Sequence, residues 1–108
     1  MVSEQMQTEL MNICGIIQTA VPAEQIYLFG SHAYGTPNAD SDYDLCVVIS
    51  DDSLLPVEAI KRIRRALYAE QSTPLDVIVC RANDFKSRQT MLSLERKIAQ
   101  EGVLLYGQ

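Results

Sequence analysis

The chain has 108 residues, of which 47% are hydrophobic and 21% charged, and this composition excludes a disordered chain. We expect residues 1–108 to form a single domain, because this length leaves no room for a separate substrate domain. The formal net charge of −5 argues against a general nucleic-acid-binding protein, whose affinity depends on Lys and Arg neutralising phosphates, so nucleic acid is not an expected partner.

The sequence carries no signals for export or for a membrane. No basic leader segment opens the chain, and no apolar stretch approaches the roughly 20 residues of a membrane span, so we expect a cytoplasmic location. Cys14, Cys46 and Cys80 are odd in number, far apart and set among apolar neighbours. This pattern predicts free, buried thiols rather than a disulfide framework.

The first half of the chain predicts a helix and two strands. Apolar residues recur at helical spacing between Ser3, a plausible N-cap, and Pro22, and predict an amphipathic helix. Residues 26–29 then form a short strand that we expect to be buried on both faces, followed by a turn at Gly30 and Ser31. Residues 31–34 are compatible with one helical turn, residues 35–38 with a break, and residues 42–49 with the second strand.

The second half predicts two helical segments and two strands. A helix is expected over residues 56–70, with Pro56 at an early position where its missing N–H does no harm, and a strand over 75–80. Residues 84–101 carry a weaker helical pattern that we expect to be interrupted near residues 86–90. Gly102 suits a helix C-terminus, and residues 103–106 read as a closing strand. This order predicts an α/β (α+β) fold.

The most informative stretch runs from Gly30 to Asp44. A Gly-Ser pair at a strand end presents backbone N–H groups to which an anion can approach closely, because glycine has no Cβ. Asp42 and Asp44 stand two apart on an extended segment, so both carboxylates project from one face. The sequence therefore predicts phosphate donors and metal ligands in the same place.

A third acid, Asp76, opens the strand predicted over residues 75–80. If Gly30, Asp42 and Asp76 share a site, the first two strands run antiparallel and the second and third run parallel, in a mixed sheet of about four strands. Carboxylates on neighbouring strands, about 5 Å apart, repel by roughly 3 kcal/mol at an effective dielectric of about 20. Mg²⁺ held between carboxylates and substrate phosphates would offset this repulsion. The alternative is that these are ordinary strand-end acids, with Asp76 pointing elsewhere.

Other motifs fail at the residues that matter. A calcium loop starting at Asp40 needs Gly at its sixth position and Glu at its twelfth, where this chain has Leu45 and Asp51. A P-loop starting at Gly30 needs Lys where Thr36 stands. One histidine and three scattered cysteines do not form a zinc-binding pattern.

Gly30-Ser31, ten residues, Asp42-Tyr43-Asp44 and a later lone Asp76 resemble the nucleotidyltransferases of the DNA polymerase β-like superfamily. The layout is similar to the minimal nucleotidyltransferase branch, a catalytic domain alone that is usually encoded beside a helical HEPN-domain protein. The resemblance implies that Gly30 and Ser31 hold the triphosphate, with Ser41 shaping the turn. It implies two Mg²⁺ ions on Asp42, Asp44 and Asp76, with Asp76 taking the proton of the acceptor hydroxyl.

The same resemblance implies an ATP-dependent enzyme that transfers AMP, or another nucleotide, to a hydroxyl of a HEPN-type toxin and so acts as its antitoxin. His32 and Tyr34 occupy positions where many members carry arginine, so a partner would have to supply that charge. Two alternatives stay open: a binding module that neutralises its partner by contact, and nucleotidyl transfer to a small molecule or an RNA end. A homo-oligomer is also possible.

A basic stretch falls on the helix predicted over residues 56–70. Lys61, Arg62, Arg64 and Arg65 crowd together and are compatible with binding to an acidic partner or to RNA. The simpler interpretation is a solvated helix face, because Glu58 stands four residues before Arg62 and supports the helix locally.

Overall fold

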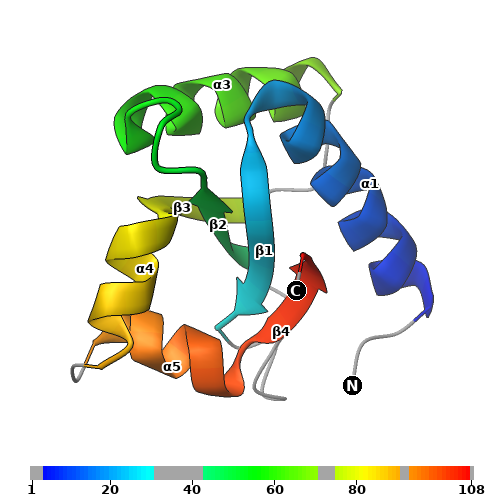
Figure 1. The fold of residues 1–108 in the computed structure, drawn as a ribbon. Helices are drawn as coiled ribbons and strands as arrows, with labels where there is room; N and C mark the ends of the chain where they lie inside the picture. The colour runs from blue at the N-terminus through cyan, green and yellow to red at the C-terminus, as the bar shows by residue number, and fades with distance from the viewer. Residues whose placement is uncertain (1–3, 31–42, 71–74, 91–92, 108) are drawn as a thin grey trace.

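The computed structural model describes residues 4–30, 43–70, 75–90 and 93–107 (Figure 1). The described part of the chain contains both helices and strands. In chain order they are α1 (Glu4–Ala20), β1 (Ala23–Phe29), β2 (Tyr43–Ile49), α3 (Pro56–Ala69), β3 (Leu75–Arg81), α4 (Ala82–Arg88), α5 (Leu94–Glu101) and β4 (Val103–Tyr106). The α/β (α+β) class expected from the sequence is confirmed.

The four described strands form one mixed sheet in the order β3-β2-β1-β4. Strand β2 runs antiparallel to β1 and parallel to β3, and β4 pairs antiparallel with β1. Helix α3 is the crossover between the two parallel strands, which is the connection that a parallel pair requires. The antiparallel and parallel relations predicted from the placement of the acids are both confirmed.

Helices cover both faces of the sheet (Figure 1). On one face, α1 and α3 pack over the larger core, to which alternate residues of β2 contribute Leu45, Val47 and Ile49. On the other face, α4 and α5 contribute Phe85 and Ile98 to a smaller cluster with the intervening residues Cys46 and Val48. Strand β2 is therefore buried from both sides, because successive side chains point to opposite faces.

Three predicted boundaries differ from the structure. Strand β1 begins three residues earlier than expected, because Ala23 and Gln25 pair with the end of β2 despite a register shift between them. Helix α4 begins at Ala82 rather than at residue 84. The break between α4 and α5 falls after Arg88 and ends at Ser93, later than the predicted interruption at residues 86–90.

The cysteines are free, as predicted: Cys14 and Cys46 are buried and Cys80 is half-buried. Burial raises the pKa of Cys14 to about 11, so this thiol stays protonated at neutral pH. Within the described ranges, no helix is both long and apolar enough to cross a membrane.

Candidate active site

Asp44 and Asp76 lie side by side at the starts of the two parallel strands. They are register partners in the β2–β3 ladder. Neighbours in register point to the same side of a sheet, and both acids fall on the α4–α5 face, in phase with Cys46 on β2 and Ile78 on β3. Asp44 is half-buried and Asp76 is exposed. The sheet thus places a shielded and an open carboxylate on adjacent strands.

Gly30, at the end of strand β1, lies at the same edge of the sheet as the two acids. It follows β1, whose last residue, Phe29, is the register partner of Asp44. A Cβ at Gly30 would overlap Oδ2 of Asp44 and lie 3.0 Å from its Cγ. The backbone φ of Gly30 is +78°, in the left-handed region that side chains disfavour. Glycine is therefore required here for two reasons, and the carboxylate of Asp44 lies against its Cα.

The opposite face of the sheet fixes the start of β2. Tyr43, only 5% exposed, belongs to the larger core, and its hydroxyl donates a hydrogen bond to Oε2 of Glu9 on α1 at 3.0 Å. Burial, this hydrogen bond and the charge of Glu9 raise the pKa of Tyr43 to about 12. Helix α1 thereby anchors the residue directly before Asp44. The sequence analysis did not single out Glu9, because a glutamate on a helix gives no sign of a partner 34 positions away.

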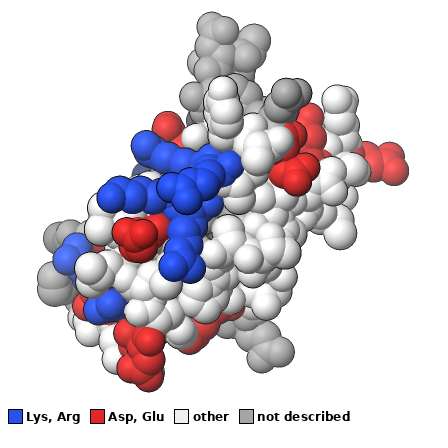
Figure 2. Space-filling view, turned by 90° about the horizontal axis from the view of Figure 1, so that it is seen from above, with Lys and Arg blue, Asp and Glu red and all other residues white. Residues whose placement is uncertain are grey.

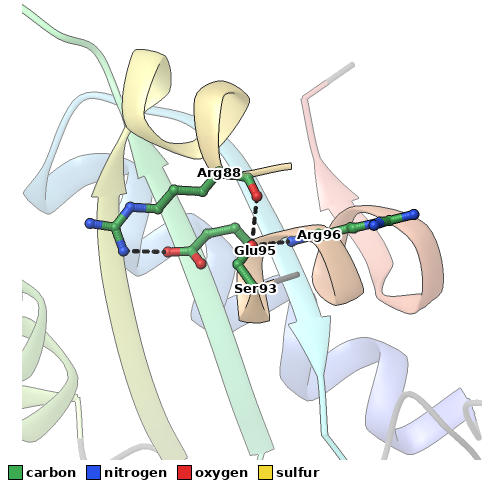
Figure 3. Close-up of polar contacts among 4 residues, drawn as sticks. All are labelled: Arg88, Ser93, Glu95 and Arg96. Atoms are coloured by element: carbon green, nitrogen blue, oxygen red, sulfur yellow. Dashed lines mark hydrogen bonds and ion pairs between the residues drawn. The ribbon is translucent and has the colours of Figure 1, made fainter. Parts of the chain in front are cut away.

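The corner between α4 and α5 borders the same face as the acids (Figure 3). The Ser93 hydroxyl donates to the carbonyl of Arg88 at 2.6 Å and accepts from the N–H of Arg96 at 3.2 Å. A guanidinium nitrogen of Arg88 lies 3.5 Å from Oε2 of Glu95, whose side chain is only 15% exposed. These contacts join the two short helices, although their sequence predicted only one interrupted helix.

The thiols of Cys46 and Cys80 lie on the same face of the sheet as the acids. Cys46 follows Asp44 by two residues on β2, and it forms a hydrogen bond with Cys80 of β3. This hydrogen bond and burial raise the pKa of Cys46 far above its ordinary value. Cys46 therefore remains a neutral thiol and brings no competing charge next to the carboxylates.

The chemistry of the donors fits a hard cation. Carboxylate oxygens are the ligands that Mg²⁺ prefers, and Mg²⁺ takes few of them when substrate phosphates complete its coordination. Within the described residues, no group of three or more His, Cys, Asp or Glu side chains could hold a metal ion, and Asp44 and Asp76 supply two adjacent carboxylates. Asp42, Ser31 and Ser41, predicted to complete the site, lie outside the described residues, as do His32 and Tyr34.

Comparison with known proteins identifies the domain family. The family model of the nucleotidyltransferase domain matches residues 10–105, almost the whole chain. No curated protein sequence matches at a significant level.

Three solved structures show the same fold, each with low sequence identity. A proposed nucleotidyltransferase from Sulfolobus solfataricus aligns with a TM-score of 0.68 and 21% identity, over 96% of this chain and 82% of that one. A toxin–antitoxin structure with AMP-PNP aligns with a TM-score of 0.55 and 20% identity, over 94% and 73%. A tri-AMPylated HEPN toxin from Shewanella oneidensis in complex with an MNT antitoxin gives 0.57 and 21%, over 94% and 72%.

The match to the family model extends across both carboxylates, the glycine turn and all four described strands. It confirms the enzyme class that the spacing of Gly30, Asp42 and Asp44 indicated. The chain belongs to the nucleotidyltransferase domain family.

Proposed function

We propose that this protein is a minimal nucleotidyltransferase that uses Mg²⁺ to transfer AMP from ATP to a hydroxyl of a HEPN-type toxin, which it thereby silences. The observation that carries the proposal is the pairing of Asp44 with Asp76 beside Gly30. Two adjacent carboxylates repel each other, by roughly 3 kcal/mol at 5 Å and an effective dielectric of about 20. A surface that only bound a partner would gain nothing from this arrangement.

Each residue has a role in the proposed reaction. Gly30 lets the triphosphate approach the backbone closely, and Ser31 donates to it. Asp42, Asp44 and Asp76 hold two divalent ions, which, when bound, neutralise the charge that develops on the attacking and leaving oxygens. Ser41 shapes the turn before Asp42.

The step is an in-line displacement at the α-phosphorus. The acceptor oxygen forms a new bond to this phosphorus while the bond to the bridging oxygen of the β-phosphate breaks. The bond electrons leave with pyrophosphate, and the hydroxyl proton passes to Asp76. The exposure of Asp76 supports this role, because the base must meet an acceptor that comes from outside the domain.

The protein acceptor is supported by the solved structures of similar fold. Two of them are toxin–antitoxin structures, one with AMP-PNP and one with an AMPylated HEPN toxin. We infer that an arginine of the partner supplies the positive charge that His32 and Tyr34 do not provide near the triphosphate.

The test is to incubate the protein with Mg²⁺, ATP and the HEPN-domain protein of its genomic neighbourhood, and then to measure the mass of both chains. We expect one or more AMP additions on the partner, none after chelation of divalent ions, and none with Asp44→Asn. If Asp44→Asn neutralises the toxin in cells as well as the unchanged protein does, the enzymatic proposal is wrong and contact alone suffices. AMP found on an RNA end, with none on the partner, would favour the third function considered above.

A further inference from the structure

A cluster of basic side chains covers the outer face of helix α3. Figure 2 shows it as a continuous group of Lys and Arg on the side of the molecule where α3 lies. The four residues are Lys61, Arg62, Arg64 and Arg65, all exposed. They are four of the nine basic residues in a chain whose net charge is −5, so positive charge is concentrated on one helix of an acidic protein.

Helical spacing arranges this face into a stripe. Ala59, Ile63 and Leu67 are buried in the larger core, so the opposite side of α3 faces solvent. At about 100° per residue, the side chains of Val57, Lys61, Arg64, Arg65 and Tyr68 fall within an arc of about 100° on that outer side, bordered by Glu58. We call these five residues the α3 stripe. It has a basic middle between two large apolar ends.

The ends of the stripe are more exposed than large apolar side chains in a folded domain usually are. Val57 is 57% exposed and Tyr68 is 86% exposed. Arginine and tyrosine are enriched in protein interfaces, where an aromatic side chain anchors and a guanidinium pairs with carboxylates. Exposed apolar residues beside arginines on one helix face are therefore typical of a surface that binds protein.

The stripe carries three positive charges, and the described acid beside them on α3 is Glu58, three residues before Lys61. Lys61 lies three and four residues before Arg64 and Arg65, a spacing at which like charges destabilise a helix. Within the described residues, none of the basic residues of α3 forms an ion pair. An acidic surface laid along α3 would remove this repulsion and supply the missing partners.

The position of the stripe relates it to the active site. Helix α3 packs on the face of the sheet opposite to Asp44 and Asp76, so the stripe does not belong to the catalytic edge. Its Tyr68 end is the end of α3 that precedes β3 in the chain, since α3 ends at Ala69 and β3 begins at Leu75, next to Asp76. A partner lying along α3 would extend past Tyr68 towards the strand that carries Asp76.

We propose that the α3 stripe is the docking surface for an acidic helical face of the protein acceptor. This inference rests on the proposed function for the identity of the acceptor. Nucleic acid fits the stripe less well, because Val57 and Tyr68 flank only a few positive charges and the chain as a whole repels a long polyanion.

The test measures binding of the HEPN-domain partner by calorimetry. The variant Arg64→Glu/Arg65→Glu should bind the partner at least about 30-fold more weakly, and Tyr68→Ala about 5-fold more weakly. The matched control Lys86→Glu/Lys97→Glu makes the same change in net charge on α4 and α5, and should stay within about 3-fold of the unchanged protein. Circular dichroism and ATP binding should be unchanged in the α3 variant, since its substituted side chains are exposed.

Each outcome decides the docking proposal separately from the enzymatic one. Equal partner affinity for the α3 variant and the control, or no partner binding at all, overturns the docking surface. It is also overturned if the α3 variant loses binding to a labelled short oligouridylate but retains the protein partner. Asp44→Asn tests the chemistry independently. If the partner binds through α3 but no AMP is transferred, the docking surface stands and the proposed reaction fails.

Discussion

The two faces of the sheet divide structure from chemistry. The face under α1 and α3 holds the larger core, where Tyr43 of β2 donates a hydrogen bond to Glu9 of α1. The face under α4 and α5 holds a smaller cluster and carries Asp44 and Asp76. Tyr43 and Leu45 are buried in the core, and Asp44 between them, on the other face, is the residue that we propose to support the reaction.

This division explains how a domain of 108 residues can keep the two repelling carboxylates of Asp44 and Asp76 side by side. One face is packed well enough to fix the strands, so the other face can leave part of the sheet uncovered for a substrate. If the division is real, substitutions on the two faces should have opposite signatures. Changes on the core face should lower stability, and changes at the acids should lower activity without affecting stability.

The largest effect is expected at Asp76. Asp76→Asn removes the proposed base and metal ligand, so AMP transfer should fall on the order of 10³-fold. Because Asp76 is exposed and lies next to Asp44, the midpoint of urea denaturation should change little or rise slightly. Transfer rates and urea midpoints measured on the same preparation check both parts. A large loss of stability would mean that Asp76 supports the fold instead.

The core face should lose the most stability. Ile63 of α3 and Ile98 of α5 are both fully buried, which makes them matched probes of the two clusters. Ile63→Ala should cost about 3 to 4 kcal/mol, and Ile98→Ala about 2 kcal/mol, because the smaller cluster is bordered by half-exposed side chains and can close around the cavity. Urea denaturation of both variants measures the difference. Equal costs would contradict the ranking of the two faces.

A substitution at Gly30 should lower both the stability and the rate of AMP transfer. In Gly30→Ala the new methyl group would meet the carboxylate of Asp44 in a backbone conformation that alanine disfavours. We expect a loss of about 1 to 2 kcal/mol in stability and about 10²-fold in transfer. Gly15→Ala is the control, since nothing lies within 4 Å of that position on α1, and it should stabilise by about 0.5 to 1 kcal/mol.

The link between Tyr43 and Glu9 should appear at alkaline pH. The pKa of Tyr43 rises from 10.0 to about 12 in the folded protein, so its contribution to stability is complete below pH 10 and is lost as the pH rises towards 12. The free energy of unfolding should fall over this range by about 1 to 2 kcal/mol more than in Tyr43→Phe. Tyr68→Phe, at an exposed tyrosine, should show the same fall in the free energy of unfolding over this pH range as the unchanged protein.

The smallest effect is expected at the α4–α5 corner. Arg88→Gln removes the partner of Glu95, but the side chain of Arg88 is 59% exposed and its distance to the carboxylate is 3.5 Å. We expect a cost of about 0.5 kcal/mol that shrinks in high salt. Thermal melts of both proteins at low and high ionic strength measure it. A cost that does not depend on salt would indicate that the corner is held by packing.

The sequence predicted the topology because the expected meeting of the glycine turn and the acids fixed the strand directions, which hydrophobic periodicity alone does not do. The expectation that Gly30, Asp44 and Asp76 meet at one edge required β2 to run antiparallel to β1 and parallel to β3, and the structure has both relations. The structure places these three residues together, and their roles in a site stay predictions. For Ser31, Ser41 and Asp42 the placement also stays a prediction, since they lie outside the described residues.

The missed start of α4 depends on a contact between distant residues. Asp84 appeared to be the start of α4, but the N–H of Asn83 donates to Oδ1 of Asp51 at 2.9 Å, so a side chain 32 positions away supports an earlier helix start. Ser93 caps α5 through local contacts, with Arg96 and Arg88. The distant partner Asp51 is not visible in a local sequence pattern, and the same holds for Glu9 beneath Tyr43.

The sheet order gives the two paired acids different backbones. Strand β2 has a neighbour on each side, so the amides around Asp44 belong to the part of the domain that opens least often. Among the described strands, β3 is at the sheet edge and pairs with β2 alone, so the backbone around Asp76 should exchange its amide protons sooner. The carboxylate proposed to meet the incoming hydroxyl is thus the one on the strand whose backbone hydrogen bonds open more often.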